Sequence, residues 1–312
     1  MRILILGASG NLGKYITNFL FINKYEVIAH LRNKKKNINF NENIKLINFD
    51  ISSNFSKLNF DINSIDFIIN CVAETKKVKL MNNSNILFLK IFLEKFTQLS
   101  KNKFTLIHFS TIGIYSKNDS KIISEESTPI PYNEYEKSKN EAEKIIKLYS
   151  KKFKNMSYYI FRLGIVYGPS IESNVLNRLQ KISNKIFYFK LSNTYSPFID
   201  IRDICQFIEL SLQNKILINN SYNLTENYKL EDIIFSLRNK NKSKLIIIKL
   251  NKKIIYLFFL FFSTISYRIN MQQFTFLSSE KQFNNNKISL YRKNLKKYNL
   301  INFILNAKNH EK

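Results

Sequence analysis

The chain has 312 residues and a formal net charge of +26, with 45% hydrophobic and 23% charged residues. A chain of this length buries a full core as one large domain or two joined ones, and its composition is that of a globular protein. Two cysteines and three histidines exclude a disulfide framework and a clustered metal site, so no metal is expected. The basic residues are scattered rather than gathered on one segment, which argues against a nucleic-acid partner.

The first predicted element is a buried parallel strand over Ile3–Leu6, and a glycine turn over residues 7–13 leads from it into a helix. No signal-peptide pattern precedes the strand, so a cytoplasmic location is expected. Half of the six glycines lie in this turn. Glycine allows a tight turn and close approach of the backbone to a phosphate, which N–H groups at the helix start bind. The predicted dinucleotide contacts are Gly7, Ser9, Gly10, Asn11, Leu12 and Gly13.

The second predicted strand, Glu26–Leu31, ends in a basic segment. An acidic residue at this strand end usually holds the free 2′-hydroxyl of NAD. Here Arg32 follows the strand, with Lys34, Lys35 and Lys36 shortly after it. A guanidinium makes paired hydrogen bonds to a 2′-phosphate, so the cofactor is expected to be NADP or NAD, with NADP favoured. A solvated basic loop is the alternative interpretation.

Five more apolar segments are predicted strands, and helical patterns lie between most of them. They cover residues 44–49, 67–71, 104–109, 158–163 and 198–201. This alternation predicts an α/β fold with a doubly wound parallel sheet, the Rossmann fold, and a smaller C-terminal α/β subdomain. The dinucleotide-binding domain is expected over residues 1–164, with 198–218 returning to it. Residues 165–197 and 219–312 are expected to form the substrate-binding subdomain.

The segment around Tyr135 is rich in Glu, Lys and Ala and predicts a helix. Tyr135 and Lys139 are four residues apart and so share one face, with about 5–6 Å between their Cβ atoms. A fixed cation beside the phenol is expected to lower the pKa of Tyr135 from ~10. The side chain could then exchange a proton with a substrate hydroxyl or carbonyl. Taken alone, the pair is weak evidence, and a solvated helix face is the simpler interpretation.

A run of fourteen uncharged residues, Ile254–Tyr267, lies between Lys253 and Arg268. A helix of this length is shorter than the ~20 residues that a membrane span needs. We expect a helix packed on the substrate subdomain and no transmembrane span. A peripheral membrane contact is left open.

Several motifs follow one another in a fixed order. They are the glycine turn at 7–13, Asp50-Ile51, Asn70-Cys71-Val72-Ala73, Ser110-Thr111-Ile112-Gly113-Ile114-Tyr115, Tyr135 with Lys139, Arg162-Leu163-Gly164-Ile165-Val166-Tyr167-Gly168-Pro169, and Phe198-Ile199-Asp200-Ile201-Arg202-Asp203. In residue type, spacing and order they resemble the extended short-chain dehydrogenase/reductase family, the NAD-dependent epimerase/dehydratase group. The resemblance covers residues 1 to about 230, and more faintly 278–300.

The resemblance implies three catalytic residues. Thr111 would hydrogen-bond the reacting oxygen; Ser110 is its rival, and the offset to Tyr115 favours Thr111. Tyr135 would be the acid/base, and Lys139 would hold the cofactor ribose and lower the tyrosine pKa. The further cofactor contacts implied by the resemblance are Asp50 and Ile51 at the adenine and Ala73 at the nicotinamide ribose.

Three departures from the family pattern bear on the substrate. Ile112 and Gly113 stand where family dehydratases carry an Asp-Glu pair, so 4,6-dehydration is not expected. Ile165 and Ser196 stand where sugar-nucleotide epimerases often carry Asn and a diphosphate-binding Arg.

The resemblance implies NAD(P)-dependent hydride transfer at an oxygen-bearing carbon of a nucleotide-linked sugar, by an epimerase or a keto-reductase. A reductase of a non-sugar carbonyl compound is one alternative. A non-catalytic, NAD(P)-bound interaction or assembly protein is another, and the intact Thr111, Tyr135 and Lys139 argue against it. The expected partner is a small-molecule substrate, with a homodimer left open.

Overall fold

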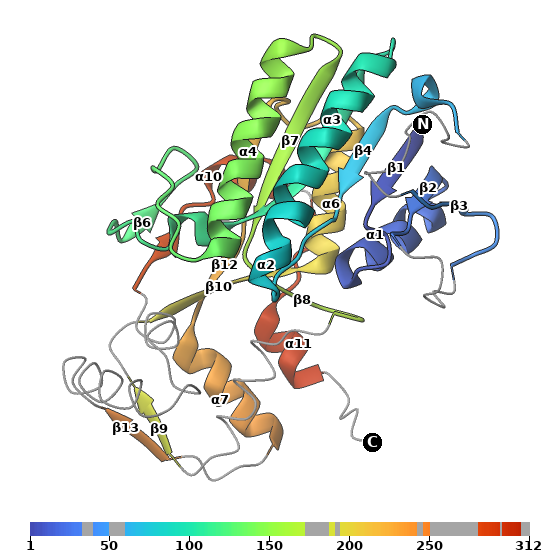
Figure 1. The fold of residues 1–312 in the computed structure, drawn as a ribbon. Coiled ribbons are helices and arrows are strands. Elements are labelled where there is room, and N and C mark those ends of the chain that lie inside the picture. Colours follow the sequence, from blue (N-terminus) through green and yellow to red (C-terminus); the bar gives the residue numbers. More distant parts are fainter. Residues whose placement is uncertain are drawn as a thin grey trace.

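Seven parallel strands form the main sheet of the protein (Figure 1). The computed structural model describes residues 1–32, 40–49, 60–171, 187–190, 194–241, 246–249, 280–293 and 295–306. The strands of this sheet are β1 (Arg2–Leu6), β2 (Glu26–His30), β3 (Lys45–Ile47), β4 (Phe67–Asn70), β5 (Phe104–Thr111), β7 (Met156–Leu163) and β11 (Asn220–Leu224). Their order is β11-β7-β5-β4-β1-β2-β3, and each neighbouring pair is parallel. This order confirms the predicted doubly wound sheet.

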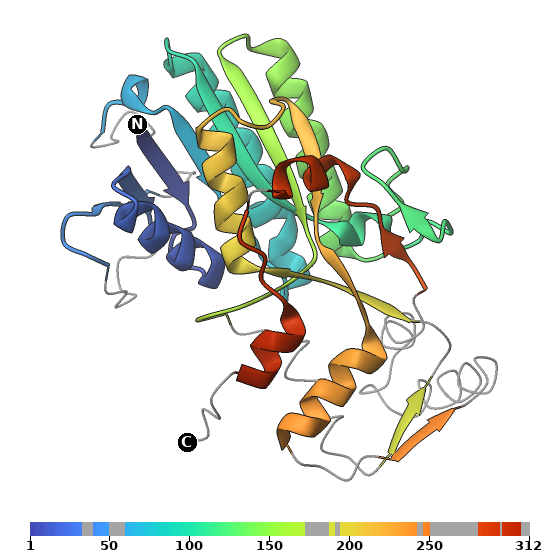
Figure 2. The ribbon, with the colours of Figure 1, turned by 180° about the vertical axis from the view of Figure 1, so that it is seen from behind.

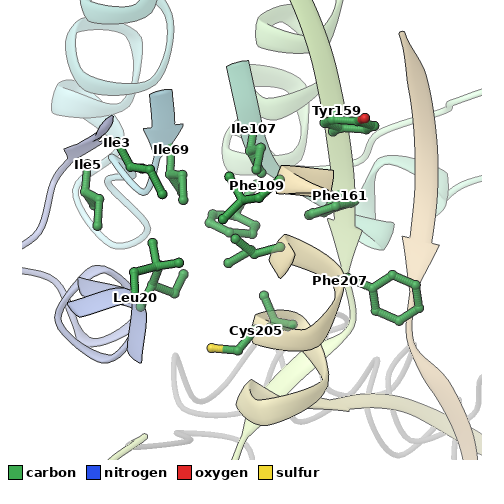
Figure 3. Close-up of a cluster of buried hydrophobic side chains, with 14 of the residues drawn as sticks. Ile3, Ile5, Leu20, Ile69, Ile107, Phe109, Tyr159, Phe161, Cys205 and Phe207 are labelled. Carbon is green, nitrogen blue, oxygen red and sulfur yellow. The ribbon is translucent and has the colours of Figure 1, made fainter. Parts of the chain in front are cut away.

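Helices bury both faces of this sheet (Figures 1 and 2). They are α1 (Asn11–Ile22) and α6 (Ile201–Leu212) on one face, and α3 (Phe88–Leu99) and α4 (Glu134–Lys152) on the other. Alternate residues of β1 point to opposite faces: Ile3 and Ile5 join the cluster with α1 and α6 that Figure 3 shows, whereas Leu4 and Leu6 join the other. Because helices cover both faces, the central strands β1 and β4 are nearly continuous hydrophobic runs, as the sequence predicted.

The other described elements lie around this sheet. A smaller sheet, of order β12 (Glu226–Lys229), β10 (Tyr195–Asp200) and β8 (Ile165–Tyr167), lies near its carboxyl edge. The helices α7 (Leu230–Asn241) and α11 (Leu300–Asn306) pack against this smaller sheet around Tyr167 and Phe198. The strands outside the main sheet are β6 (Ile122–Ile123), β8 (Ile165–Tyr167), β9 (Phe187–Lys190), β10 (Tyr195–Asp200), β12 (Glu226–Lys229), β13 (Ile246–Lys249) and β14 (Gln282–Phe283). The short or peripheral helical segments are η2 (Ile62–Ser64), α2 (Val78–Met81), the π-helical η3 (Asn82–Leu87), η4 (Ile112–Tyr115), α7 (Leu230–Asn241), α10 (Asn286–Arg292) and α11 (Leu300–Asn306).

Two strands differ from the sequence prediction, one in the sheet it joins and one in not having been predicted. The predicted strand at 198–201 belongs to β10 of the smaller sheet, and α6 after it returns to the main sheet. β11 forms the edge of the main sheet beside β7, although it lies within 219–312, the range expected for the substrate subdomain. Its five residues include only two apolar ones, Tyr222 and Leu224, so no hydrophobic run marked it.

Several predicted features fall outside the described residues. They are Asp50 and Ile51, the three lysines at 34–36, and the apolar run Ile254–Tyr267. Each stays a prediction. Within the described part of the chain, no helix is both long enough and apolar enough to cross a membrane.

A buried carboxylate links α6 to α10. Asp203 Oδ2 lies 3.4 Å from Arg292 Nη2, and Arg292 Nη1 lies 2.7 Å from Glu226 Oε1. Asp203 is only 4% exposed, and burial raises its pKa to about 7 although Arg292 acts in the opposite direction. The folded protein therefore binds this proton more tightly than the unfolded chain does, where an Asp has a pKa of about 4.

This difference predicts a pH-dependent stability. Between pH ~4 and ~7 the folded state holds the Asp203 proton longer, so this group stabilises less as the pH rises. Because Asp203→Asn cannot titrate, we expect the free energy of unfolding of the wild type, minus that of the variant, to fall across this range. Chemical denaturation at several pH values measures it, with Asp232→Asn on α7, an exposed carboxylate, as control. A difference that is flat with pH would contradict the prediction.

Candidate active site

A cavity of about 170 Å³ opens at the carboxyl ends of β4, β5 and β7. All three predicted catalytic residues, Thr111, Tyr135 and Lys139, line it. Two predicted cofactor contacts, Leu12 of α1 and Ala73 after β4, line it as well. The lining residues, from Leu12 to Val166, therefore meet at the sheet edge where doubly wound folds bind ligands.

The glycine turn between β1 and α1 has the backbone that the sequence predicted. Gly7 has φ +76°, and a Cβ there would lie 3.0 Å from Val72 Cγ2. A Cβ on Gly13 would lie 2.3 Å from the Gly7 carbonyl oxygen, so α1 could not pack so closely on the turn. Gly10 is the N-cap of α1, whose first turn carries no acidic residue. The first turn therefore places no carboxylate of its own at the positive end of the helix dipole, which suits a phosphate.

Thr111 is the last residue of β5 and the N-cap of η4. Its side-chain oxygen accepts a hydrogen bond of 3.1 Å from the Gly113 backbone N–H. The turn thus fixes the hydroxyl oxygen at the cavity wall and leaves the hydroxyl hydrogen available for a second partner. Ser110, the rival for this role, lines the same cavity but is 3% exposed.

Tyr135 and Lys139 lie in the first turns of α4. The helix begins at a capping box in which the Asn133 side chain accepts from the Glu136 N–H and the Glu136 side chain accepts from the Asn133 N–H. The box fixes the register of the helix start, so both side chains reach the cavity from one helix face.

The pKa of Tyr135 moves in the direction opposite to the one expected. Burial, with a smaller contribution from the charge of Glu136, raises the pKa of Tyr135 to about 12. The expected lowering of this pKa is therefore wrong for the protein by itself, because desolvation of the phenolate dominates. Burial also lowers the pKa of Lys139 to about 8, and nearby Cys71 and Glu143 limit that change. The Tyr135 phenol is thus protonated at neutral pH.

A hydrogen-bonded link that no sequence motif indicated joins the β4 loop to the start of α4. Asn85, in the π-helical η3, accepts from Glu74 N–H at 2.7 Å and donates to the Glu74 carbonyl at 3.0 Å. Its amide also donates to Ser138 Oγ at 2.9 Å, and Ser138 donates to the Tyr135 carbonyl at 2.7 Å. Asn85 lies in a run of similar polar residues, and only the three-dimensional contacts distinguish it.

The remaining predicted cofactor residues do not line this cavity, and Asp50 and Ile51 lie outside the described residues. Ser9, Gly10 and Asn11 form the solvent-facing part of the glycine turn. Arg32 is exposed, one residue beyond the buried Leu31 at the carboxyl end of β2. No cluster of side chains that could hold a metal ion occurs among the described residues.

The parallel sheet, the glycine turn and the Tyr-Lys pair at one cavity define a Rossmann-type dinucleotide-binding protein. The chain belongs to the NAD dependent epimerase/dehydratase family, whose family model matches residues 3–225. Family membership makes it an NAD(P)-binding enzyme and confirms the resemblance seen in the sequence.

Curated relatives and solved structures agree with this assignment. GDP-6-deoxy-D-talose 4-dehydrogenase of Aggregatibacter actinomycetemcomitans is 27% identical over 233 residues, covering 72% of this chain and 74% of the relative. A putative UDP-glucose 4-epimerase of Methanocaldococcus jannaschii is 27% identical over 210 residues, covering 63% and 65% of the two chains. The crystal structure of UDP-glucuronic acid 4-epimerase from Bacillus cereus with UDP-glucuronic acid and NAD has a TM-score of 0.71 at 21% identity, covering 97% and 96%. This last likeness shows the fold.

Proposed function

We propose that the protein is an NAD(P)-dependent oxidoreductase or epimerase that transfers hydride at an oxygen-bearing carbon of a nucleotide-linked sugar. The observation that carries the proposal is the convergence of Thr111, Tyr135 and Lys139 on one cavity, beside the glycine turn. A hydroxyl, a phenol and an ammonium group there can bind, polarise and protonate a carbonyl oxygen.

The cofactor site fits a dinucleotide. Gly7 and Gly13 hold the backbone of the turn close to α1, and the helix start carries no acidic residue. The diphosphate would lie on the N–H groups at the start of α1. Ala73 and Lys139 would contact the nicotinamide ribose. When bound, the cofactor supplies the hydride donor or acceptor.

The catalytic residues then divide the proton chemistry. The Tyr135 hydroxyl gives its proton to the substrate oxygen when a carbonyl is reduced and takes it back when an alcohol is oxidised. Thr111 donates its free hydroxyl hydrogen to the same oxygen, since the Gly113 N–H already occupies one of its lone pairs. The positive charge of Lys139 stabilises negative charge that develops on the phenol and on the substrate. The raised pKa of Tyr135 favours the protonated, carbonyl-reducing form at neutral pH.

The substrate class rests on the relatives, whose names indicate nucleotide sugars. A non-sugar carbonyl compound is the second candidate. Ser196 favours it, because this fully buried side chain stands where an Arg would bind the sugar nucleotide diphosphate. The partly buried, apolar Ile165 on β8 agrees with that candidate.

The direct test begins with the purified protein. Mass spectrometry of small molecules released on denaturation identifies the cofactor that copurifies. The holoenzyme is then assayed with UDP-, GDP- and dTDP-linked sugars and, in parallel, with small ketones. Turnover of a nucleotide sugar supports the proposal, and turnover of ketones alone supports the second candidate. A bound dinucleotide without any turnover would support a non-catalytic protein.

The preference for NADP over NAD is a further part of the proposal. Arg32 is exposed at the end of β2, and neither Arg32 nor the buried Leu31 supplies the carboxylate that would repel a 2′-phosphate. A charge-assisted contact of ~1.5–3 kcal/mol corresponds to roughly tenfold to a hundredfold discrimination. We expect NADP(H) to bind more tightly than NAD(H), and Arg32→Ala to lose most of that preference.

Titration of both cofactors into the wild type and the variant measures the preference. Lys45→Ala, which removes an exposed cation from the neighbouring β3, controls for general charge effects. Equal affinities in the wild type, or an NADP preference untouched by Arg32→Ala, would contradict the assignment of Arg32.

A further inference from the structure

The space left by Gly113 is occupied by a carboxylate from α4. A Cβ placed on Gly113 would lie 3.0 Å from Glu136 Cγ and 3.2 Å from Glu136 Oε1. The same point is 3.2 Å from Thr111 Oγ1. The missing side chain at position 113 therefore lets Glu136, the residue after Tyr135, reach the turn that begins at Thr111.

Glu136 joins this turn to the helix start through hydrogen bonds at both carboxylate oxygens. Ser116 Oγ, at the end of η4, donates to Oε2 at 2.5 Å. The Tyr132 and Asn133 N–H groups donate to the same oxygen at 2.7 and 3.3 Å, and Asn133 Nδ2 donates to Oε1 at 2.8 Å. A capping box alone needs only the bond to the N-cap N–H. The bond to Ser116 connects two different elements.

We propose that Glu136 is a positioning residue that holds the Thr111 turn against the Tyr135 helix, and that glycine at position 113 lets its side chain approach this closely. The inference rests on the proposed function, because Thr111 and Tyr135 must both reach one substrate oxygen. Hydroxyl groups on a turn and on a separate helix keep their spacing only when something fixes the two elements together. A mutation far from the reacting atoms that displaces the reacting groups by 1 Å can cost about a hundredfold in rate.

Glu136 also acts electrostatically on Tyr135. The Glu136 charge adds to burial in raising the pKa of Tyr135. Glu136→Gln retains the shape of the side chain and removes the charge, so the pKa of Tyr135 should fall. In the oxidising direction, where Tyr135 must accept a proton, kcat/KM rises with pH up to this pKa. The rise should therefore move to lower pH in the variant, an effect that a purely structural role would not produce.

The first experiment measures pH profiles of kcat/KM for the wild type and Glu136→Gln, with the nucleotide sugar that gives turnover in the screen above. Glu134→Gln is the matched control, because Glu134 lies next to Tyr135 on the other side, is exposed and pairs with Lys137 at 2.7 Å. We expect a loss of tenfold to a hundredfold in kcat for Glu136→Gln, together with the shifted profile, and neither change for Glu134→Gln. An unshifted profile with a normal kcat would overturn the proposal.

The second experiment is a double-mutant cycle of Gly113→Ala and Glu136→Ala. Gly113→Ala should lower kcat/KM about tenfold more when Glu136 is present than in the Glu136→Ala background. In that background the new methyl group no longer meets the Glu136 side chain. The same cycle read in thermal unfolding needs no turnover. Additive effects in both readouts would refute the packing of residue 113 against Glu136. If the cycle shows coupling in thermal unfolding but the wild type turns over no substrate, the proposed function fails, whereas the contact between residue 113 and Glu136 stands.

Discussion

Replacing Tyr135 by Phe is expected to lower kcat by about 10²–10⁴-fold and to leave cofactor affinity nearly unchanged. In the proposed function the phenol hydroxyl carries the proton, and Phe keeps the ring that lines the cavity. Burial raises the pKa of Tyr135 to about 12, so the wild-type hydroxyl is protonated throughout the neutral range. The variant therefore lacks the hydroxyl that would transfer the proton, while the packing of α4 is retained.

The matched control is Tyr132→Phe. Tyr132 lies three residues before Tyr135, just ahead of the Asn133 N-cap of α4, is 46% exposed, and contacts Lys117 through its ring. Removing its hydroxyl should change kcat by less than about threefold, since no part of it reaches the reacting atoms. Steady-state assays of both variants, with fluorescence titration of the cofactor, give the comparison. Turnover of Tyr135→Phe within a few-fold of the wild type would refute the assignment of the acid/base.

The largest expected effect on stability is that of Glu143→Gln. Arg162 of β7 and Glu143 of α4 form an ion pair in which Arg162 Nη2 and Nε lie 2.7 and 3.0 Å from the two carboxylate oxygens. The side chains are only 3% and 2% exposed. Arg162 also donates hydrogen bonds to the Tyr115 hydroxyl and to the Glu125 carbonyl. Glutamine would leave the buried guanidinium charge without its counter-charge.

Breaking one side of a buried pair in this way costs about 3–5 kcal/mol. Glu141→Gln on the same helix is the control, because the Glu141–Lys144 pair is exposed and such pairs contribute ~0–1 kcal/mol. Chemical denaturation of both variants at one pH gives the two differences in the free energy of unfolding. Equal losses in the two variants would show that Arg162 finds compensation elsewhere.

Local patterns were sufficient to predict the frame of the fold. The runs that became β1, β4 and β5 are apolar on both faces, and the glycine turn lies where a strand meets a helix. Each of these signals spans a few consecutive residues and needs no long-range contact. The edge strand β11 lacked such a signal, because Asn220, Ser221 and Asn223 break its pattern.

In the site, too, the residues could be predicted from the sequence, whereas the properties that depend on long-range contacts could not. Thr111, Tyr135 and Lys139 were predicted by spacing and by family resemblance, and the structure brings them to one cavity. Their electrostatics could not be predicted, because the raised pKa of Tyr135 comes from burial by residues distant in sequence. Asn85 was missed for a related reason, since its partners lie 11 and 53 positions away. The cytoplasmic location and the homodimer stay predictions.

The most direct test of the account follows the absorbance of the nicotinamide after rapid mixing of the holoenzyme with UDP-glucose or UDP-glucuronic acid, or with the nucleotide sugar found by the screen. If hydride passes between the cofactor and the sugar, the reduced-nicotinamide absorbance of the wild type changes within one turnover. The same mixing with Tyr135→Phe then gives a change slower by about 10²–10⁴-fold. A wild-type holoenzyme whose nicotinamide absorbance stays constant with every nucleotide sugar, or a Tyr135→Phe trace that matches the wild type, would contradict the account.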